Sequence, residues 1–375
     1  MKTLILSCNT GGGHNTAAKA LKEVFDSQND DCVIKDALSF GGQLASDLVC
    51  DSYIEMVKRA PKMFGELYKL GGKIGQINSV SNDILRSPVY LVNKLYADAL
   101  EEYILQNEFD AIICTHIFPL EALTHLRRRH NLKTPIYFIV TDYAATPMLE
   151  ETVPDIIFSP HKDSLYTFTA KGIPEDKIIA TGIPVAQKFT VPRDKNEARK
   201  ELGLSAEQKV YLLMGGSMGF GDTEDTVSEL LSMADENTRL IVITGSNKEL
   251  YASLDQKFNG NRNLMLVGFT DKVNDYMAAA DVLMTKPGGL SSTEALVRGI
   301  PLIHTSPIPG CETENVEFFT QHHISLCAKD SKEAARLAKK LVDDKFLSRQ
   351  ILDAQKNYRY ENSAEEVVKI IKQRM

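Results

Sequence analysis

The stretch Thr3-Leu4-Ile5-Leu6-Ser7-Cys8-Asn9-Thr10-Gly11-Gly12-Gly13-His14 decides the fold of the first half of the chain. Its apolar beginning predicts a short buried strand, and its three glycines turn the chain directly into a helical pattern. The same order returns in the second half, where the apolar run Val210–Met214 ends in Gly215 and Gly216. A strand, a glycine turn and a helix, used once in each half, predict two α/β domains in series.

Further short apolar runs, each followed by a helix-length segment, predict doubly wound parallel sheets that helices cover on both faces. The runs are Ala111–Thr115, Pro135–Thr141, Ile156–Ser159, Ile178–Thr181, Leu240–Thr244, Met265–Val267, Val282–Thr285 and Pro301–His304. The chain of 375 residues is also longer than one ordinary hydrophobic core supports. Because prolines bracket residues 184–193, we place a linker there. We expect an N-terminal domain over residues 1–188 and a C-terminal domain over residues 189–363.

The composition disfavours several classes of protein. The 43 Lys and Arg against 50 Asp and Glu give a net charge of −7, which argues against nonspecific nucleic-acid binding. None of the six cysteines forms a C-x-x-C pair, so we expect neither a zinc knuckle nor a dithiol motif, and no metal. No apolar run approaches the roughly 18 residues that span a bilayer, and the apolar N-terminal stretch is shorter than that of a signal peptide. We therefore expect a cytoplasmic protein.

One segment, residues 55–95, departs from this acidic average. Seven Lys and Arg face only three Asp and Glu there, a local charge of +4 within a chain of −7. Such a segment is either a helical excursion with a solvated face or an interfacial surface, since cations beside apolar side chains suit anionic lipid headgroups. On the second interpretation, the membrane- or acceptor-facing residues are Lys58, Arg59, Lys62, Phe64, Lys69 and Lys73.

The two glycine turns suit different chemistry. In the first turn the backbone of Gly12 and Gly13 can approach an anion at a helix N-terminus. The turn is not a G-x-G-x-x-G motif, and we see no acidic residue closing a second strand as a ribose ligand would, so dinucleotide binding is disfavoured. His14, with an ordinary pKa near neutrality, is a candidate general base. In the second turn the amides of Gly215 and Gly216 and the hydroxyl of Ser217 could cradle a phosphate.

The most specific stretch is Lys286-Pro287-Gly288-Gly289-Leu290-Ser291-Ser292-Thr293-Glu294. It predicts that a strand ends, that Pro-Gly-Gly turns the chain, and that Ser291 or Ser292 starts a helix with Glu294 in its first turn. A carboxylate at that place either caps the helix or accepts two hydrogen bonds from a ribose diol. Both interpretations of Glu294 stand at this point.

Taken together, these motifs resemble the monogalactosyldiacylglycerol synthase and processive diacylglycerol glucosyltransferase family, relatives of the bacterial MurG transferase. The resemblance rests on the order of Gly11-Gly12-Gly13-His14, Thr141-Asp142, Gly215-Gly216-Ser217, Lys286-Pro287-Gly288-Gly289 with Glu294, and Pro309-Gly310 with Glu312 and Asn315. It spans essentially the whole chain. It implies the GT-B fold, in which two Rossmann-like domains flank a cleft, and a C-terminal helix over residues 364–375 that packs back on the N-terminal domain.

The resemblance further implies an inverting transfer of a hexose from UDP-glucose or UDP-galactose to diacylglycerol or its monoglycosyl form. His14 is then the base that takes the acceptor proton, with Asp142 as a second catalytic candidate. The donor-binding residues it implies are Gly12, Gly13, Gly215, Gly216, Ser217, Phe269, Thr270, Lys286, Pro287, Gly288, Gly289, Ser291, Ser292, Glu294, Glu312 and Asn315. Phe269 and Thr270 frame the uracil, Glu294 takes the ribose, and Glu312 and Asn315 face the hexose. No tightly bound cofactor or metal is implied, and the enzyme would sit peripherally on the inner face of the cell membrane.

Two departures from the family pattern leave the substrates open. Cys311 stands where relatives commonly carry glutamine, and Tyr143–Met148 replaces a stretch that commonly carries His-Pro and an aromatic residue. The alternatives are a MurG-like transfer to a polyprenyl-linked cell-wall precursor, a cytosolic UDP-sugar epimerase, and a non-enzymatic nucleotide-binding regulator. The hexose, the number of sugars added and the oligomeric state stay open.

Overall fold

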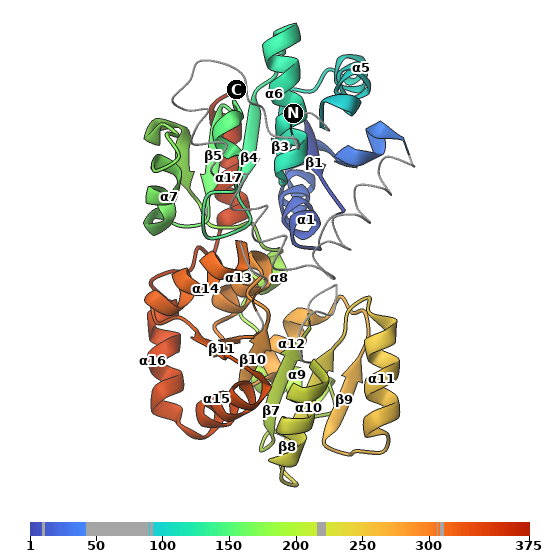
Figure 1. The fold of residues 1–375 in the computed structure, drawn as a ribbon, viewed down its shortest axis with the longest axis vertical. Helices are drawn as coiled ribbons and strands as arrows, with labels where there is room; N and C mark the ends of the chain where they lie inside the picture. The colour runs from blue at the N-terminus through green and yellow to red at the C-terminus, as the bar shows by residue number, and fades with distance from the viewer. Residues whose placement is uncertain (10–11, 43–89, 91–92, 216–222, 306, 308–310) are drawn as a thin grey trace. The chain divides into compact units, whose positions relative to one another are not determined.

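The computed structural model describes residues 1–9, 12–42, 90, 93–215, 223–305, 307 and 311–375. The described chain forms two compact units (Figure 1). The first unit comprises residues 1–187, 308–314 and 362–375, and the second comprises residues 188–307 and 315–361. Each unit is built on a six-stranded, fully parallel sheet.

The sheet of the first unit has the order β2-β1-β3-β4-β5-β6. Its strands are β1 (Lys2–Ser7), β2 (Asp31–Asp36), β3 (Ala111–Cys114), β4 (Ile136–Ile139), β5 (Ile156–Ser159) and β6 (Ile178–Ala180). The helices are α1 (Gly12–Ser27), α5 (Ala97–Asn107), α6 (Ile117–His130), α7 (Leu165–Thr169) and α17 (Ser363–Gln373). Short 3-10 helices are η1 (Ala37–Gly41), η2 (Lys94–Tyr96), η3 (Leu149–Glu151), η4 (Lys162–Ser164) and η5 (Glu175–Lys177).

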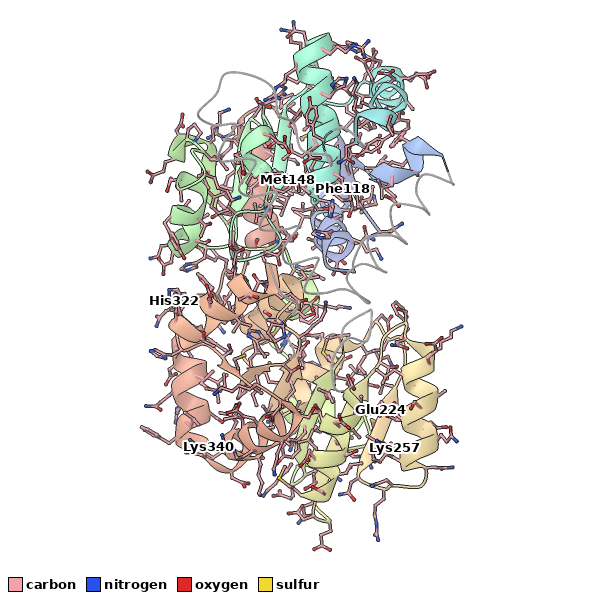
Figure 2. All side chains as sticks on the ribbon, viewed as in Figure 1. Phe118, Met148, Glu224, Lys257, His322 and Lys340 are labelled. Atoms are coloured by element: carbon pink, nitrogen blue, oxygen red, sulfur yellow. The ribbon has the colours of Figure 1, made fainter. Side chains whose placement is uncertain are left out.

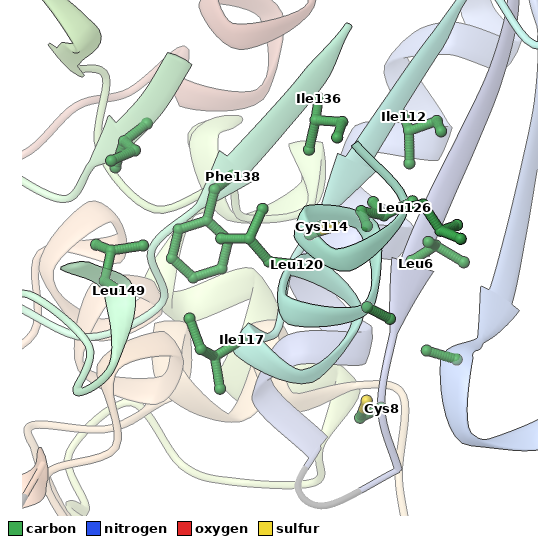
Figure 3. Packing of buried hydrophobic residues seen from close by; sticks show 14 of the residues in the cluster. Leu6, Cys8, Ile112, Cys114, Ile117, Leu120, Leu126, Ile136, Phe138 and Leu149 are labelled. Carbon is green, nitrogen blue, oxygen red and sulfur yellow. The ribbon is translucent and has the colours of Figure 1, made fainter. Parts of the chain in front are cut away.

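The strand β1 is apolar throughout because both of its faces are buried. Leu4 and Leu6 point to one face and join a core that α5 and α6 cover, part of which is drawn in Figure 3. Ile5 points to the other face, where α1 and α17 cover it. Successive residues of a strand alternate between faces, so a strand with a helix layer on each side needs an unbroken apolar run.

The edge strand β2 was not predicted from the sequence. Its residues Asp31 and Lys35 are exposed, as the outer position in the sheet allows, and they interrupt the apolar pattern. The expectation that no acidic residue closes a second strand was therefore wrong, since β2 ends in Asp36. That carboxylate accepts hydrogen bonds from the Leu38 amide (3.1 Å) and from Nδ2 of Asn9 (2.6 Å), so it fixes the chain around the first glycine turn.

The sheet of the second unit has the order β12-β11-β10-β7-β8-β9. Its strands are β7 (Lys209–Met214), β8 (Thr238–Ile243), β9 (Leu264–Val267), β10 (Val282–Thr285), β11 (Leu302–His304) and β12 (Leu326–Cys327). Its helices are α9 (Lys195–Glu201), α10 (Thr223–Ser232), α11 (Lys248–Phe258), α12 (Val273–Ala279), α13 (Gly289–Arg298), α15 (Ser331–Asp343) and α16 (Lys345–Gln355). Two helices, α8 (Gln187–Thr190) and α14 (Cys311–Gln321), cross a boundary between the units.

Candidate functional site

In the first unit, the C-terminal edge of the sheet brings His14 to the ends of two neighbouring strands. His14 lies in the first turn of α1, Thr115 follows β3 and Thr141 follows β4. Nδ1 of His14 lies 2.8 Å from the carbonyl oxygen of Thr115 and 2.9 Å from the hydroxyl of Thr141. A carbonyl oxygen can only accept, so Nδ1 carries the proton and Nε2 of the neutral ring keeps its lone pair. This tautomer is the one a general base requires.

The surroundings of His14 keep its ring neutral. Burial lowers the pKa of His14, against the opposing influence of the Asp142 carboxylate and the Thr115 carbonyl. Asp142 therefore lies close enough to influence the ring, as the Thr141-Asp142 motif led us to expect. An imidazole that is unprotonated at neutral pH can accept a proton from a hydroxyl group.

A second histidine, His116, adjoins His14 and was not predicted. The two rings meet edge to face with centroids 4.5 Å apart. Nδ1 of His116 accepts a hydrogen bond from the Phe118 amide (3.2 Å), and burial holds the pKa of His116 well below its usual range. The centroid of its ring also lies 4.4 Å from that of Phe118, which is labelled in Figure 2. A neutral His116 thus supports the His14 ring without adding charge. The only sequence signal was its place directly after a strand, at Thr115-His116.

The glycine turn before His14 is held by polar side chains. Nδ2 of Asn15 donates to Oδ1 of Asn9 (2.7 Å), and Asn9 in turn donates to Asp36. Gly12 and Gly13 form the first turn of α1, where Gly12 is exposed and its carbonyl accepts from the Thr16 hydroxyl (2.9 Å). The first turn of an α-helix has amides without an intrahelical acceptor, which is the feature that an anion site uses.

In the second unit, the expected donor loops also follow the C-terminal ends of strands. Gly215 follows β7, while Gly216 and Ser217 lie outside the described residues. After β10, the amide of Gly288 donates to the carbonyl of Lys286 (2.9 Å) and closes a tight turn around Pro287. Gly288 has an ordinary φ of −68°, and a Cβ there would meet no atom of the described residues within 4 Å. Neither backbone strain nor packing demands glycine at this position.

The helix after this turn begins earlier than the sequence predicted. α13 starts at Gly289 with Gly288 as its N-cap, not at Ser291 or Ser292. Glu294 therefore lies in the second turn, and the capping interpretation of Glu294 is wrong. Its side chain is only 7% exposed and makes no hydrogen bond or ion pair with any residue that the structure describes. Burial raises the pKa of Glu294 to about 8, against the opposing charge of Lys188.

Two expected donor residues have their polar groups engaged within the second unit. The hydroxyl of Ser292 is fully buried and bonds to Nε2 of His304 (3.0 Å), while the hydroxyl of Ser325 bonds to Nδ1 of the same ring (3.2 Å). Burial lowers the pKa of His304 to about 3. The amide of Asn315, also fully buried, donates to the Pro287 carbonyl (2.9 Å). Ser292 and Asn315 thus hold α13 and the 286–288 turn in place.

The remaining expected residues differ in exposure. Phe269 is 84% exposed after β9, and the hydroxyl of Thr270 accepts from the Lys272 amide (3.1 Å). Ser291 is half-buried, and Glu312 on α14 is buried. The basic residues Lys58, Arg59, Lys62, Lys69 and Lys73 and the neighbouring Phe64 lie outside the described residues.

The described part of the chain has neither a cluster of metal ligands nor a membrane-spanning helix. Within it, no group of three or more His, Cys, Asp or Glu side chains is placed to hold a metal ion. Over the same ranges, no helix combines the length and the apolar character needed to cross a membrane.

Comparison with known proteins gives consistent matches over both units. Residues 14–185 match the family described as monogalactosyldiacylglycerol (MGDG) synthase, and residues 210–373 match the glycosyltransferase family 28 C-terminal domain. A processive diacylglycerol β-glucosyltransferase from Staphylococcus aureus (strain Newman) is 26% identical over 346 residues, covering 91% of this chain and 85% of that protein. These matches confirm the resemblance inferred from the motifs.

Solved structures show the same fold at low identity. MurG from Acinetobacter baumannii is 14% identical with a TM-score of 0.63, covering 100% of this chain and 99% of that one. The UDP-GlcNAc 2-epimerase from Neisseria meningitidis, solved with UDP-GlcNAc, is 13% identical with a TM-score of 0.63 over 100% of both chains. The two Rossmann-like units have the GT-B fold, as predicted.

Proposed function

Because residues 14–185 match the monogalactosyldiacylglycerol synthase family and residues 210–373 match the glycosyltransferase family 28 C-terminal domain, we propose that the chain moves a hexose from a UDP-sugar to diacylglycerol or its monoglycosyl form. The observation that carries this proposal is His14, whose neutral ring directs its proton to the Thr115 carbonyl and leaves Nε2 free of a proton. A hydroxyl group is a weak nucleophile until a positioned base takes its proton.

The reaction then proceeds in one displacement with inversion at the anomeric carbon. Nε2 of His14 takes the proton of the acceptor hydroxyl, whose oxygen forms the new bond to the anomeric carbon. The bond from that carbon to the β-phosphate oxygen breaks, and its electron pair leaves with UDP. The Asp142 carboxylate, which raises the pKa of His14 against the effect of burial, stabilises the imidazolium that forms. Asp142 is the alternative base in this scheme.

The donor would bind at the C-terminal edge of the second sheet, where parallel sheets bind ligands. Glu294 would accept the ribose hydroxyls, which is supported by a buried carboxyl group that lacks a partner among the described residues. Neither the backbone conformation nor packing requires glycine at position 288, and the missing side chain would leave room for the donor to approach the turn. The resemblance to the family implies further donor-binding residues, which are Gly12, Gly13, Gly215, Gly216, Ser217, Phe269, Thr270, Lys286, Gly289, Ser291 and Glu312. Ser292, Asn315 and Pro287 would act by positioning.

The acceptor is a lipid, so the enzyme would work at a membrane surface. We place this contact on Lys58, Arg59, Lys62, Phe64, Lys69 and Lys73, because this segment carries a local charge of +4 in an acidic chain. Electrostatic binding of this kind weakens as salt screens the charges. Vesicles that contain anionic lipid should therefore retain the protein at low salt and release it at high salt.

The test is incubation with labelled UDP-glucose or UDP-galactose and diacylglycerol in anionic micelles, followed by analysis of the lipid products. The substitution His14→Ala should lower transfer by about 10²–10⁴-fold, the range expected for loss of a general base. UDP affinity should stay near that of the wild type. The matched control is His130→Ala, since His130 is exposed on α6 and, among the described residues, pairs with Glu101 away from the His14 ring.

Three results would contradict the proposal. Unchanged transfer by His14→Ala would remove His14 from the mechanism. Conversion of the UDP-sugar without any labelled lipid would favour the epimerase alternative. Labelling of a polyprenyl-linked acceptor in place of diacylglycerol would favour the MurG-like alternative.

A further inference from the structure

The second unit contains a cavity of about 670 Å³ away from the loops assigned to the donor. Asp281 and Pro301, which line it, directly precede β10 and β11. The cavity therefore lies at the N-terminal edge of the sheet, whereas Gly215 and the 286–288 turn follow the C-terminal ends of β7 and β10. Its volume falls within the range of about 300–1,000 Å³ that is typical of small-molecule sites.

The lining of this cavity is strongly cationic. Among the described residues that line it, six are basic, Arg193, Lys195, Arg298, Lys345, Arg349 and Arg359, and two are acidic, Asp281 and Glu361. Both carboxylates are already engaged. Asp281 accepts from Lys195 (2.6 Å), from Arg199 (2.9 Å) and from the Val210 amide (2.8 Å), and Glu361 pairs with Arg359 (2.6 Å).

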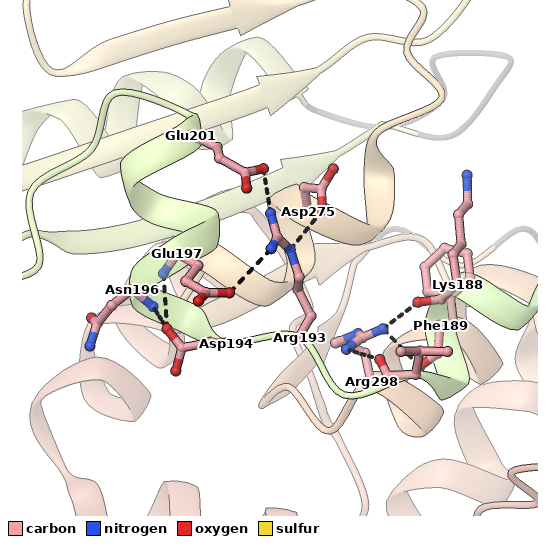
Figure 4. A network of polar contacts seen from close by, with 10 residues as sticks. Lys188, Phe189, Arg193, Asp194, Asn196, Glu197, Glu201, Asp275 and Arg298 are labelled. Carbon is pink, nitrogen blue, oxygen red and sulfur yellow. Dashed lines mark hydrogen bonds and ion pairs between the residues drawn. The ribbon is translucent and has the colours of Figure 1, made fainter.

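Arg193 and Arg298 differ in the groups to which their guanidinium groups bond. Figure 4 shows Arg193 held by carboxylates, including Asp275 at 3.2 Å. The guanidinium of Arg298 instead donates to backbone carbonyls, those of Val191 (3.0 Å), Lys188 (2.6 Å) and Phe189 (2.9 Å). Its Nε is buried with no hydrogen-bond partner among the described residues. Carbonyl oxygens orient Arg298 but do not neutralise its full positive charge.

Lys345 and Arg349 have no partner in the part of the chain that the structure describes. They lie four residues apart on α16, so both side chains face the same side of the helix. Arg349 influences the carboxylate of Asp353, which is already paired with Lys356 (2.7 Å). These two residues and Arg298 leave three cationic side chains without a carboxylate partner around one cavity.

We propose that this cavity binds the phosphate group of an anionic ligand, with Lys345, Arg349 and Arg298 as its cationic contacts. A guanidinium matches two phosphate oxygens with parallel hydrogen bonds, and an ammonium adds a compact charge beside it. Since the cavity volume is several times that of an inorganic phosphate, the ligand carries a larger body or a second phosphate. A soluble phosphate ester and a lipid headgroup present the same chemistry.

The test uses inorganic pyrophosphate, titrated by calorimetry into the full chain in the presence of saturating UDP. UDP occupies the proposed donor site, so that remaining binding reports on other sites. The variant Lys345→Gln/Arg349→Gln should bind pyrophosphate about tenfold or more weakly than the wild type, because it removes two charges from the binding site. The control Lys332→Gln/Lys340→Gln removes two exposed charges from α15, outside the cavity lining, and should bind like the wild type (Lys340 is labelled in Figure 2).

A second arm separates the two ligand sources. Phosphatidylcholine vesicles with and without phosphatidate are sedimented with the same three proteins. If the variant keeps its pyrophosphate affinity but loses phosphatidate-dependent sedimentation, the phosphate belongs to a lipid. If the cavity variant matches the control in both arms, with unchanged melting temperature, the proposal is overturned. Both substituted side chains are exposed, so the variant should fold normally.

Discussion

Raising the pH should tighten UDP binding by this chain, because Glu294 is assigned to accept two hydrogen bonds from the ribose. A carboxylate accepts on both oxygens, whereas a protonated carboxyl group keeps one oxygen as a donor. Burial raises the pKa of Glu294 to about 8. At pH 7 about one molecule in ten then carries the carboxylate, and at pH 9 about nine in ten do. Apparent affinity scales with this competent fraction, so the dissociation constant should fall about tenfold between pH 7 and pH 9.

The assay is a series of UDP titrations by calorimetry from pH 6 to pH 9 at constant ionic strength. Glu294→Gln keeps the shape of the side chain and cannot ionise, so its UDP affinity should lack this tenfold rise. UDP itself loses a phosphate proton in the lower part of this range, and that contribution is common to both proteins. The difference between wild type and variant therefore isolates Glu294. As a control, Glu236→Gln alters an exposed carboxylate in the turn before β8 and should follow the wild type.

Parallel pH profiles for the wild type and Glu294→Gln would refute the ribose assignment, whatever their absolute affinities. A profile that rises at a lower pH would keep the assignment and show that Lys188, which opposes burial at Glu294, has the larger influence. Lys188→Met distinguishes these cases, because losing that charge should move the rise to higher pH.

Three further predictions concern stability. Burial lowers the pKa of His304 to about 3, whereas its value in the unfolded chain is near 6.5. The free energy of unfolding should therefore be highest above pH 6.5 and should be about 2 kcal/mol lower at pH 5, because the unfolded chain takes up the proton first. Hydrogen exchange of β11 amides measures this free energy at each pH, and His304→Asn should remove its dependence on pH between 5 and 6.5. Asn315→Ala should cost about 1–3 kcal/mol, since it leaves the buried Pro287 carbonyl without that donor; an undisturbed melting temperature would contradict this. Ile371→Ala should cost about 2–5 kcal/mol in the first unit, because the side chain is fully buried between α17 and the sheet. Equal exchange protection of β1 amides in variant and wild type would show that α17 contributes little.

The sequence predicted the parts of the fold that depend on local pattern. Central strands such as β1 and β3 are apolar on both faces, so their runs stand out. The edge strand β2 mixes buried Cys32 with exposed Asp31, and its pattern resembles a loop. The start of α13 was misplaced because Gly289 begins that helix, and glycine is a poor helix former that the sequence pattern does not mark as a helix start.

The parts of the site that could not be predicted depend on contacts between distant segments. Ser292 looked like a donor ligand, yet its partner is His304, twelve residues away on β11. Asn315 likewise bonds to Pro287 across 28 residues. The tautomer of His14 is set by Thr115, 101 residues further on. Residue type and motif identified the candidate site positions. Which of their polar groups are already hydrogen-bonded depends on how distant strands and helices pack, and the local sequence does not contain that information.

The basic residues at the N-terminal edge of the second sheet have different roles. At the N-terminal edge, helices end and leave carbonyls that need donors, and Arg199 and Arg298 meet that need at Ala279 and at Lys188–Val191. Lys345 has no such explanation. It is the first residue of α16, where the helix dipole favours anions and disfavours a cation. Burial lowers the pKa of Lys195 on the same cavity, and the charge of Lys345 lowers it further. The ion pair with Asp281 accounts for the charge of Lys195, whereas Lys345 has no carboxylate partner among the described residues. A phosphate in the proposed site would stabilise the charge of Lys345.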